Sequence, residues 1–490
     1  MKILLVSPRT PDTFWSFKHV LKFVSKKAAF PPLGLLTVAA MLPRHWQLRV
    51  VDMNVERLKD VDLHWADFVM ISAMIVHKES VHGIVARCAG FGKRVIAGGP
   101  LFTTGHETFP EIQHFVLGEA EEVMPQLVED LRNGRLQHIY KAPGWPSLEQ
   151  TPMPRWDLVN LNNYVTLSAQ FSRGCPYDCE FCDIIVMNGR VPRTKSPARL
   201  VAELEELRLR GWKEMVFIVD DNFIGDKRRT KALLHEIIGW RWRTRAQMGF
   251  LTEASVNLAD DAELCALMVE AGFTKVFVGI ETPSVEALEE CRKLQNRGRD
   301  LVAAVRTLQQ RGLEIMGGFI VGFDSDKTDI FKRQFEFIQH SGVVTAMVGL
   351  LTALPQTRLY KRLKTEGRLE TETSGNNTDA ALNFKPKLNR EFLQSGYRDL
   401  MKKLYEPKAY YQRVRTFFEN HRTTGSRLRL SRADIMAFAK SFWLLGIWYR
   451  GRVAYWRFFW GTLLRRPNHF RRAIEFAIVG YHFRRVAQEC

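Results

Sequence analysis

The chain has 490 residues, of which 46% are hydrophobic and 25% are charged, the composition of a folded protein and not of a disordered or fibrous one. This length corresponds to about three domains. Lysine and arginine outnumber aspartate and glutamate by 71 to 53, and the net charge of +18 favours anionic partners such as nucleic acid, phosphorylated compounds or an acidic membrane surface. Seven cysteines are few and odd in number, which argues against a disulfide framework and for a reducing compartment.

The sequence shows no sign of secretion or of a membrane span. It opens directly on an apolar run, Ile3–Val6, that reads as a strand and lacks the layout of a signal peptide. No run reaches the roughly 18 consecutive apolar residues that a membrane-spanning helix needs. We therefore expect a cytoplasmic protein.

Residues 1–141 alternate short apolar strands with stretches of helical length, which predicts a parallel sheet covered on both faces. The expected strands are Ile3–Val6, Leu48–Asp52, Phe68–Ser72, Arg94–Ala97 and His114–Leu117. Ligands of such sheets bind beyond the carboxyl ends of the strands. Ser72-Ala73-Met74 follows one strand and Gly98-Gly99-Pro100 follows the next, so these are either binding segments or ordinary turns.

A proline-rich linker over residues 142–160 separates this domain from a second α/β unit at 161–370. Helices are expected at Pro197–Leu209 and Asp261–Ala271. The alternation predicts a full or partial (β/α) barrel, with strands at Tyr164–Ser172, Glu214–Val219, Gly249–Thr252, Lys275–Gly279 and Glu314–Val321.

Residues 371–490 are expected to be mostly helical, basic and aromatic. In Ser431–Cys490 there are 11 Lys or Arg against 3 Asp or Glu, and many Trp, Phe and Tyr. Three interpretations stay open: a helical cap packed on the barrel, an element lying in a membrane interface, and a nucleic-acid-binding surface. Charged residues interrupt the apolar runs, so none of them can span a bilayer.

The most informative motif is a loop with three cysteines, Cys175, Cys179 and Cys182, spaced by four and three residues directly after a strand. Thiolates this close together are soft ligands for an iron–sulfur cluster or for zinc. Structural zinc normally takes four ligands, and no fourth cysteine or histidine lies nearby. Three thiolates suit a four-iron cluster with one open iron; zinc completed by a distant residue is the alternative.

This motif resembles that of the radical S-adenosylmethionine (SAM) superfamily. The resemblance implies that the three cysteines hold a [4Fe-4S] cluster, that its open iron binds SAM, and that Phe181 lies beside the adenine. One-electron cleavage of SAM then gives a 5′-deoxyadenosyl radical, chemistry that no side chain can supply. The resemblance leaves open which of Asp220 and Asp221 holds the SAM amino group. The SAM contacts that it implies at the later strand ends are Asp220, Asp221, Asn222, Glu253, Ser255, Gly279, Glu281, Gly318 and Val321.

The N-terminal domain resembles cobalamin-binding domains. Ser72 precedes Gly98 by 26 positions, a spacing similar to that of the serine and glycine-pair elements of those domains. The histidine element that ligates cobalt from below has no counterpart, and His77 reads as an ordinary loop residue. The resemblance implies cobalamin contacts from Ser72, Ala73, Met74, Gly98, Gly99, Pro100 and Glu119.

The whole chain thus resembles the cobalamin-binding radical SAM proteins, with a Rossmann-like domain, a partial (β/α) barrel and a helical C-terminal region. Asp12–Lys18, Lys27–Pro32 and Gly375–Asp379 resemble the subgroup that includes hopanoid C-2 methylases. The expected activity is radical methylation of an unactivated carbon of an apolar, hopanoid- or isoprenoid-like substrate. The expected cofactors are the [4Fe-4S] cluster, SAM and cobalamin.

The expected partners are the small apolar substrate, a flavodoxin- or ferredoxin-like electron donor, and the inner membrane face through the C-terminal region. One alternative is a cobalamin radical SAM enzyme that cyclises, oxidises or rearranges a scaffold such as a tetrapyrrole. The other is a tRNA-modifying enzyme, but such relatives usually carry three more clustered cysteines upstream, where this chain has only Cys88. A nucleic-acid partner is therefore not expected.

Overall fold

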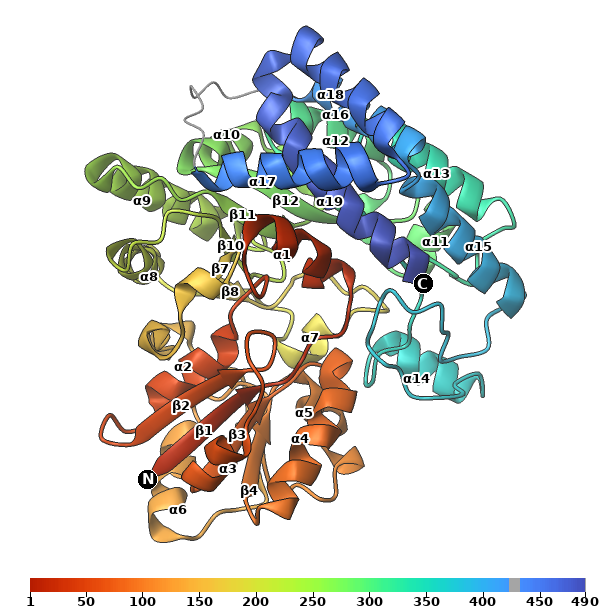
Figure 1. Ribbon diagram of the computed structural model, residues 1–490. Coiled ribbons are helices and arrows are strands. Elements are labelled where there is room, and N and C mark those ends of the chain that lie inside the picture. Colours follow the sequence, from red (N-terminus) through yellow and green to blue (C-terminus); the bar gives the residue numbers. More distant parts are fainter. Residues whose placement is uncertain (423–431, 490) are drawn as a thin grey trace.

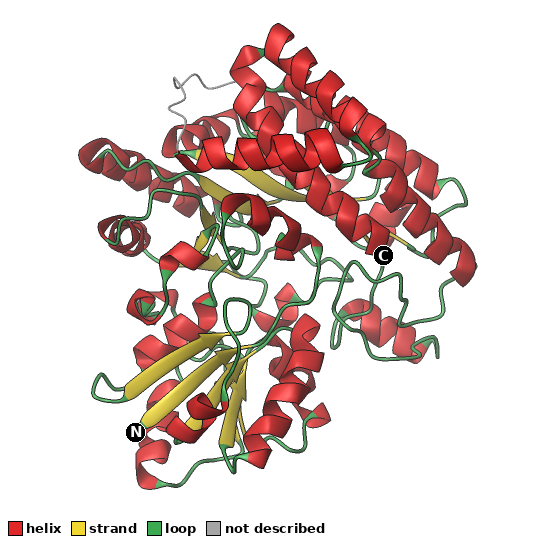
Figure 2. Ribbon diagram, viewed as in Figure 1, coloured by secondary structure: helices red, strands yellow, loops and turns green. Residues whose placement is uncertain are grey.

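The computed structural model, which describes residues 1–422 and 432–489, contains two α/β units and a C-terminal group of helices (Figure 1). Ser431 and Cys490, the ends of the predicted basic stretch, lie outside the described residues. The first unit lies at one end of the molecule, and the C-terminal helices cover the second unit at the other end (Figure 2).

The first unit is a six-stranded parallel sheet with the order β2-β1-β3-β4-β5-β6. The strands are β1 Lys2–Ser7, β2 Gln47–Asp52, β3 Phe68–Ser72, β4 Arg94–Gly98, β5 His114–Leu117 and β6 Ile139–Lys141. All five strands expected from the sequence are present, and the sequence pattern missed only β6, a short strand whose outer residues are exposed.

Helices cover both faces of this sheet because successive residues of a strand point to opposite sides. In β1, Leu4 and Val6 join one core with α3, α4 and α5, while Ile3 and Leu5 join the other with α2 and α6. The helices are α2 Leu33–Met41, α3 Asp60–Trp65, α4 Lys78–Gly90, α5 Pro100–Gly105 and α6 Met124–Asn133.

The second unit is a parallel sheet with the order β14-β13-β12-β11-β10-β7. Its strands are β7 Leu167–Ala169, β10 Val216–Ile218, β11 Phe250–Ala254, β12 Phe273–Glu281, β13 Glu314–Val321 and β14 Ala346–Leu350. The end strands β7 and β14 do not pair with each other, so the expected partial barrel is confirmed. The helices that follow its strands are α8 Pro197–Leu209, α9 Lys227–Thr244, α10 Ala262–Ala271, α11 Val285–Glu290, α12 Leu301–Gln310, α13 Ile330–Ser341 and α14 Arg358–Thr365.

One expected strand, Tyr164–Ser172, is divided in the structure. After β7 the backbone bends, and β8 Ser172–Arg173 pairs antiparallel with β9 Arg193–Thr194. Asp220 explains the bend, since its buried carboxylate accepts hydrogen bonds from the backbone N–H groups of Phe171 and Ser172. The resulting hairpin encloses the cysteine loop and the short helix α7 Ile184–Met187.

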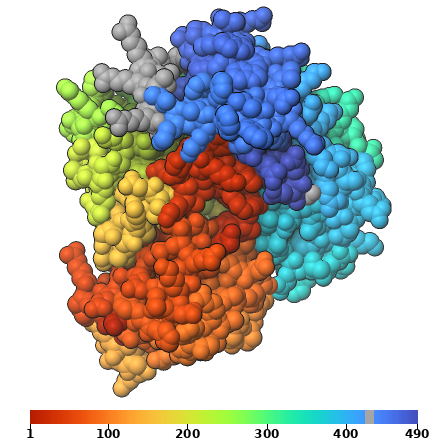
Figure 3. Space-filling view, viewed as in Figure 1, coloured from red at the N-terminus to blue at the C-terminus, as the bar shows by residue number. Residues whose placement is uncertain are grey.

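The N-terminal segment between β1 and α2 leaves its own domain and enters the barrel. The Trp15 ring stacks on Phe217 of β10 at 6.0 Å between ring centres and contacts Phe277 of β12 at 5.4 Å. Phe30 also contacts Phe217. In the sequence, helix α1 Lys18–Val24 lies between Trp15 and Phe30. A small opening framed by this segment is visible between the two units (Figure 3).

The C-terminal region is helical, as expected. Helix α19 packs on α1, and its Glu475 forms an ion pair with Lys275 of β12 inside the barrel. No described helix is long and apolar enough to cross a membrane. The helices are α15 Arg390–Leu404, α16 Pro407–Asn420, α17 Arg432–Trp443, α18 Arg452–Arg465 and α19 Phe470–Glu489, with a π-helical turn at Leu444–Trp448.

Candidate functional site: the cysteine loop and the facing strand ends

Two aspartates of one strand end fix the start of the cysteine loop. Asp220 accepts from Phe171 and Ser172, and Asp221 accepts from the backbone N–H of Gly174 at 3.2 Å and from Asn188 Nδ2 at 2.9 Å. Gly174 has φ +95°, and a Cβ there would lie 3.0 Å from the carbonyl oxygens of Asn188 and Val191, so only glycine fits. Contacts within the protein therefore fix the start of the loop.

The three cysteines lie on this loop, where Cys179 is buried and Cys175 and Cys182 are half-buried. Burial raises the pKa of each thiol, most strongly that of Cys182. Asn222 Nδ2 lies 3.8 Å from Cys175 Sγ, and Gln295 Nε2 lies 3.7 Å from Cys179 Sγ. Both amides can thus donate to sulfur, an interaction that stabilises a thiolate in a cluster.

The donor set and the spacing of the sulfurs bear on the kind of metal group that this loop could hold. The three sulfurs do not all lie within 4.8 Å of one another. A tetrahedral zinc ion with bonds of about 2.3 Å would bring its sulfur ligands to about 3.8 Å. Three thiols that receive amide donors from Asn222 and Gln295 match the ligands of a four-iron cluster with one open iron.

Lys293 is a cation beside the three cysteines, and no sequence motif pointed to it. Its Nζ lies 2.7 Å from Glu281 Oε1 and 6.0 Å from the centre of the Phe181 ring. Burial by itself would lower the pKa of Lys293, but Glu281 and Cys179 outweigh burial and the pKa is raised. Lys293 therefore stays charged and offsets negative charge on all three cysteine sulfurs.

Several residues expected to contact SAM meet at the ends of β10 to β13. Asn222 Oδ1 accepts from the Ser255 backbone N–H, which joins two of these strand ends. Burial and the nearby Asp221 raise the pKa of Glu253 to about 8, and no described residue forms a hydrogen bond or ion pair with its carboxyl group. The Glu253 carboxyl group is therefore available for a hydrogen bond beside the cysteine loop.

Gly279 and Gly318 keep the next two strand ends free of side chains. A Cβ at Gly279 would lie 2.4 Å from Glu281 Oε1, and one at Gly318 would lie 2.7 Å from the Phe277 ring. Glu281 itself has φ +65° at an irregularity of the β12–β13 pairing, which folds its side chain back toward Lys293. Phe181 lies at this edge and contacts Phe323.

Three expected contact residues have other roles in the structure. Asp220 uses both oxygens to hold the loop backbone and the Ser172 hydroxyl, so it is not open to a SAM amino group. The Val321 side chain is fully buried in the hydrophobic core. Glu119 accepts from Arg173 and Arg193, and its side chain is only 6% exposed. Periodicity and motif order could not reveal the partners of Asp220 and Glu119, because those partners are distant in the sequence.

Glu119 belongs to an ion-pair cluster that joins the two α/β units. Arg173, directly before Gly174 and Cys175, pairs with Glu119 at 2.6 Å and with Glu121 at 2.8 Å. Arg193 of β9 also pairs with Glu119. The end of β5 is therefore held against the base of the cysteine loop, which brings the carboxyl edge of the first sheet toward the second.

That edge of the first sheet carries the expected cobalamin segments. Ser72 of β3 pairs in register with Gly98 of β4, and Gly99 has φ +95°. A Cβ on Gly99 would lie 2.9 Å from the Ala73 carbonyl oxygen and from Ser72 Oγ, so the two segments pack backbone to backbone. Pro100 starts α5, and Met74 is half exposed at the edge. Ser72, Gly98 and Gly99 carry a small side chain or none, which suits the close approach of a long nucleotide tail.

His77 is buried, and both its ring nitrogens are used within the protein. Nδ1 accepts from the Met74 backbone N–H at 3.2 Å, and Nε2 lies 3.1 Å from Thr10 Oγ1. Burial lowers the pKa of His77 to about 4. The residue is thus a structural loop histidine, in agreement with its expected role.

Comparisons with known proteins bring these observations together. A model of the radical SAM superfamily matches residues 169–338, a B12 binding domain model matches 24–128, and a domain of unknown function, DUF4070, matches 357–490. The chain is 40% identical to an "Uncharacterized methyltransferase" of Synechocystis sp. over 99% of this chain and 91% of that protein. It is 32% identical to the "Hopanoid C-2 methylase" of Rhodopseudomonas palustris over 95% of this chain and 90% of that protein.

The chain belongs to the cobalamin-binding radical SAM family. It is a radical SAM enzyme of the methyltransferase type, and its cofactors are a [4Fe-4S] cluster, SAM and cobalamin. The fold agrees: the radical SAM methyltransferase TsrM of Kitasatospora setae has a TM-score of 0.62 at 15% identity, covering 100% of this chain and 99% of that one. OxsB, a cobalamin-dependent SAM radical enzyme, has a TM-score of 0.63 at 13% identity, covering 100% and 79%.

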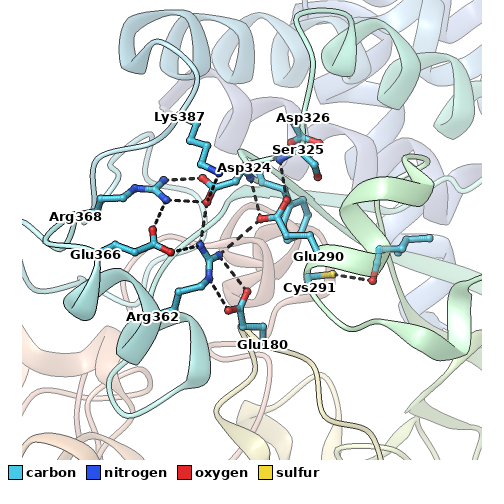
Figure 4. Close-up of polar contacts among 12 residues, drawn as sticks. Glu180, Glu290, Cys291, Asp324, Ser325, Asp326, Arg362, Glu366, Arg368 and Lys387 are labelled. Atoms are coloured by element: carbon cyan, nitrogen blue, oxygen red, sulfur yellow. Dashed lines mark hydrogen bonds and ion pairs between the residues drawn. The ribbon is translucent and has the colours of Figure 1, made fainter.

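In this radical SAM enzyme helix α14 also braces the cysteine loop (Figure 4). Arg362 of α14 donates to both carboxylate oxygens of Glu180, the residue after Cys179, at 2.7 and 3.2 Å. The Glu180 backbone N–H donates to the Cys291 carbonyl, and its carbonyl accepts from the Leu359 N–H. Asp324 joins Arg362 to Arg368, so the brace continues into the loop after β13.

Proposed function

We propose that this enzyme transfers a methyl group to an unactivated carbon of an apolar, hopanoid-like lipid. The observation that carries the proposal is the similarity to the Hopanoid C-2 methylase over 95% of the chain at 32% identity. Cys175, Cys179 and Cys182 would hold the cluster, and the edge at Ser72 and Gly98 would hold cobalamin. When bound, these groups supply one-electron cleavage of SAM and transfer of a methyl group.

The chain's own contribution would be binding, orientation and exclusion of water. Glu253 and Ser255 would hold polar groups of SAM, and Phe181 would lie along its adenine. Lys293 would balance the charge of the thiolates. Hydrogen-atom abstraction needs no general base, and placing three reactants side by side can supply much of the rate enhancement.

The barrel interior supports an apolar substrate. Trp15, Phe30 and Phe277 form an aromatic cluster within it, and each keeps part of its surface accessible. Transfer of apolar surface from water to such a wall is favourable by roughly 25 cal/mol per Å². The N-terminal segment that brings Trp15 also frames an opening in Figure 3, which gives an apolar molecule a short route inward.

Two partners belong to the proposal. A flavodoxin- or ferredoxin-like protein would supply the electron that cleaves SAM, since no described group is a redox donor of sufficient reducing power. A lipid substrate resides in a bilayer, so the protein would act from the cytoplasm at the inner membrane face.

The test is anaerobic turnover of the reconstituted enzyme with cobalamin, SAM labelled in its methyl group, a reductant and hopanoid. We expect labelled methylhopanoid together with 5′-deoxyadenosine, and neither product from Cys179→Ala. Formation of 5′-deoxyadenosine without label in the hopanoid would contradict the proposed substrate.

A second candidate is chemistry on a tetrapyrrole, without methyl transfer. It is favoured by a 24% identity to the "Anaerobic magnesium-protoporphyrin IX monomethyl ester cyclase" of Synechocystis sp. over 69% of this chain and 71% of that protein. The same assay with a magnesium porphyrin ester separates the two, because this candidate predicts an oxidised or cyclised product that carries no labelled methyl group.

A further inference from the structure

Exposed large hydrophobic side chains concentrate on one short part of the C-terminal region. Of the twenty such side chains in the described residues, nine fall within residues 435–464. Three of them are tryptophans that are more than half exposed. The nine are Ile435, Met436, Phe442, Trp443, Ile447, Trp448, Val453, Trp460 and Leu464, here called the apolar surface.

The apolar surface is not a by-product of core packing. The cores of α17 and α18 use other residues, including Ser441, Leu445, Tyr455, Phe458 and Phe459, which are buried. The exposed residues recur at helical spacing, as at 435, 439 and 443 on α17 and at 453, 457, 460 and 464 on α18. These stripes face away from the core.

Ring contacts bring the aromatic members of the apolar surface together. Trp443 lies 6.5 Å from Trp448 between ring centres. Phe442 directly precedes Trp443 on α17, and its ring centre lies 5.0 Å from that of Trp456 on α18. Trp456 in turn stacks on Trp460. An exposed apolar patch on a folded protein normally marks an interaction site.

The charge around the patch has a single sign. Between Asp434 and Glu475 the chain has no acidic residue but contains seven arginines and one lysine. Arg450, Arg457 and Arg465 are exposed and form no ion pair with a described residue. Others have partners: Lys440 donates to the Lys22 carbonyl and to Ser25 Oγ at the end of α1, and Arg466 pairs with Glu419 of α16. Arginines without ion pairs can bind phosphate oxygens, and the neighbouring tryptophans can insert into an adjoining apolar layer. The combination favours a lipid with a phosphate headgroup.

We propose that α17, the π-helical turn and α18 dock the enzyme on a bilayer that contains anionic phospholipid. Trp443, Trp448 and Trp460 would enter the headgroup region, and the arginines would bind lipid phosphates. An amphipathic basic helix binds in this way without crossing the membrane. The inference rests on the proposed function only for the reason that the enzyme would dock, namely access to a lipid substrate. Binding to the bilayer through this surface does not require turnover.

The position of the apolar surface suits this role. It lies at the end of the molecule opposite the first α/β unit (Figures 1 and 3). Lys440 links α17 to α1, and α1 directly follows the segment that carries Trp15 into the barrel. Docking would therefore place the N-terminal segment, and the opening that it frames, close to the source of an apolar substrate.

Co-sedimentation of the full-length holoenzyme with vesicles tests the proposal. The vesicles contain phosphatidylcholine with or without phosphatidylglycerol, and no substrate or reductant is added. We expect binding to the anionic vesicles that weakens with added salt, because counter-ions screen the arginines. The triple variant Trp443→Ser, Trp448→Ser, Trp460→Ser should lower the partition coefficient by at least about tenfold.

Trp242→Ser is the matched control, because Trp242 of α9 is 77% exposed but lies outside the apolar surface. It should bind vesicles like the wild type. A second variant, Arg450→Ser with Arg457→Ser, should reduce binding to anionic vesicles only. Equal sedimentation of the wild type and the triple variant with vesicles would overturn the proposal. A wild type that is a dimer in solution, together with a triple variant that is a monomer, would also overturn it, because the surface would then join two copies of the chain. Failure of hopanoid methylation with intact vesicle binding would count against the substrate alone.

Discussion

At the scale of single residues, the cluster loop depends on one buried cation. Lys293 lies among Glu281, Phe181 and the three cysteines, where a low local dielectric strengthens every charge interaction. A reduced cluster carries one more negative charge than an oxidised one. A nearby cation therefore favours reduction, which is the step that precedes SAM cleavage.

Lys293→Met should leave the three cysteine ligands in place and make the cluster harder to reduce. We expect normal iron content, a midpoint potential shifted to more negative values in an EPR-monitored titration, and slower formation of 5′-deoxyadenosine. Lys327→Met, which removes an exposed lysine from the loop after β13, is the control. An unchanged potential would mean that Lys293 only fills space.

Gly99→Ala adds one carbon atom and tests whether the carboxyl edge of the first sheet, at Ser72 and Gly98, binds cobalamin. The added Cβ would meet Ser72 Oγ and the Ala73 carbonyl oxygen at 2.9 Å, which separates the two segments. We expect loss of cobalamin absorbance from the purified protein with full retention of iron. Gly134→Ala in the same domain is the control, because Gly134 also has a positive φ, +65°, but lies in the left-handed helical region and has nothing within 4 Å of the added Cβ. Equal cobalamin retention in both variants would argue against this edge.

At the scale of elements, the sequence predicted best what depends on local pattern. Continuous Val, Ile and Leu runs identified the buried parallel strands, and His114–Leu117 and Glu314–Val321 were predicted with their observed bounds. The short edge strand β6 and the alanine- and glycine-containing β14 lack such runs and were missed. The cysteine spacing is local and was read directly. The partners of the loop, Lys293, Arg362 and Glu119, come from distant segments, so only the folded chain reveals them.

The brace between α14 and the cluster loop gives a prediction for Arg362→Lys. Lysine keeps the charge but cannot make the bidentate contact with Glu180. We expect the loop to loosen, with reduced iron and sulfide content and faster loss of the cluster in air. Lys364→Ala on the exposed side of α14 is the control and should behave like the wild type. Unchanged cluster stability in Arg362→Lys would show that the backbone contacts of Glu180 suffice.

At the scale of the whole molecule, two sheets meet with their carboxyl edges facing the same space. The ion pairs of Arg173 and Arg193 with Glu119 hold the units together at the base of the cysteine loop. The N-terminal segment and α19 close the barrel from the side. With the proposed sites, this arrangement would let one chain bind the cluster and cobalamin at two neighbouring sheet edges. Fold class and domain order followed from the sequence, but the insertion of Trp15 into the second unit did not, because it joins residues about 200 positions apart.

The account rests most directly on the metal content of the protein purified without oxygen and supplied with cobalamin. We predict a brown protein with about four iron and four labile sulfide per chain, together with bound cobalt, and loss of the iron and sulfide alone in Cys179→Ala. A colourless protein that holds one zinc ion and no labile sulfide, with or without that substitution, would contradict it.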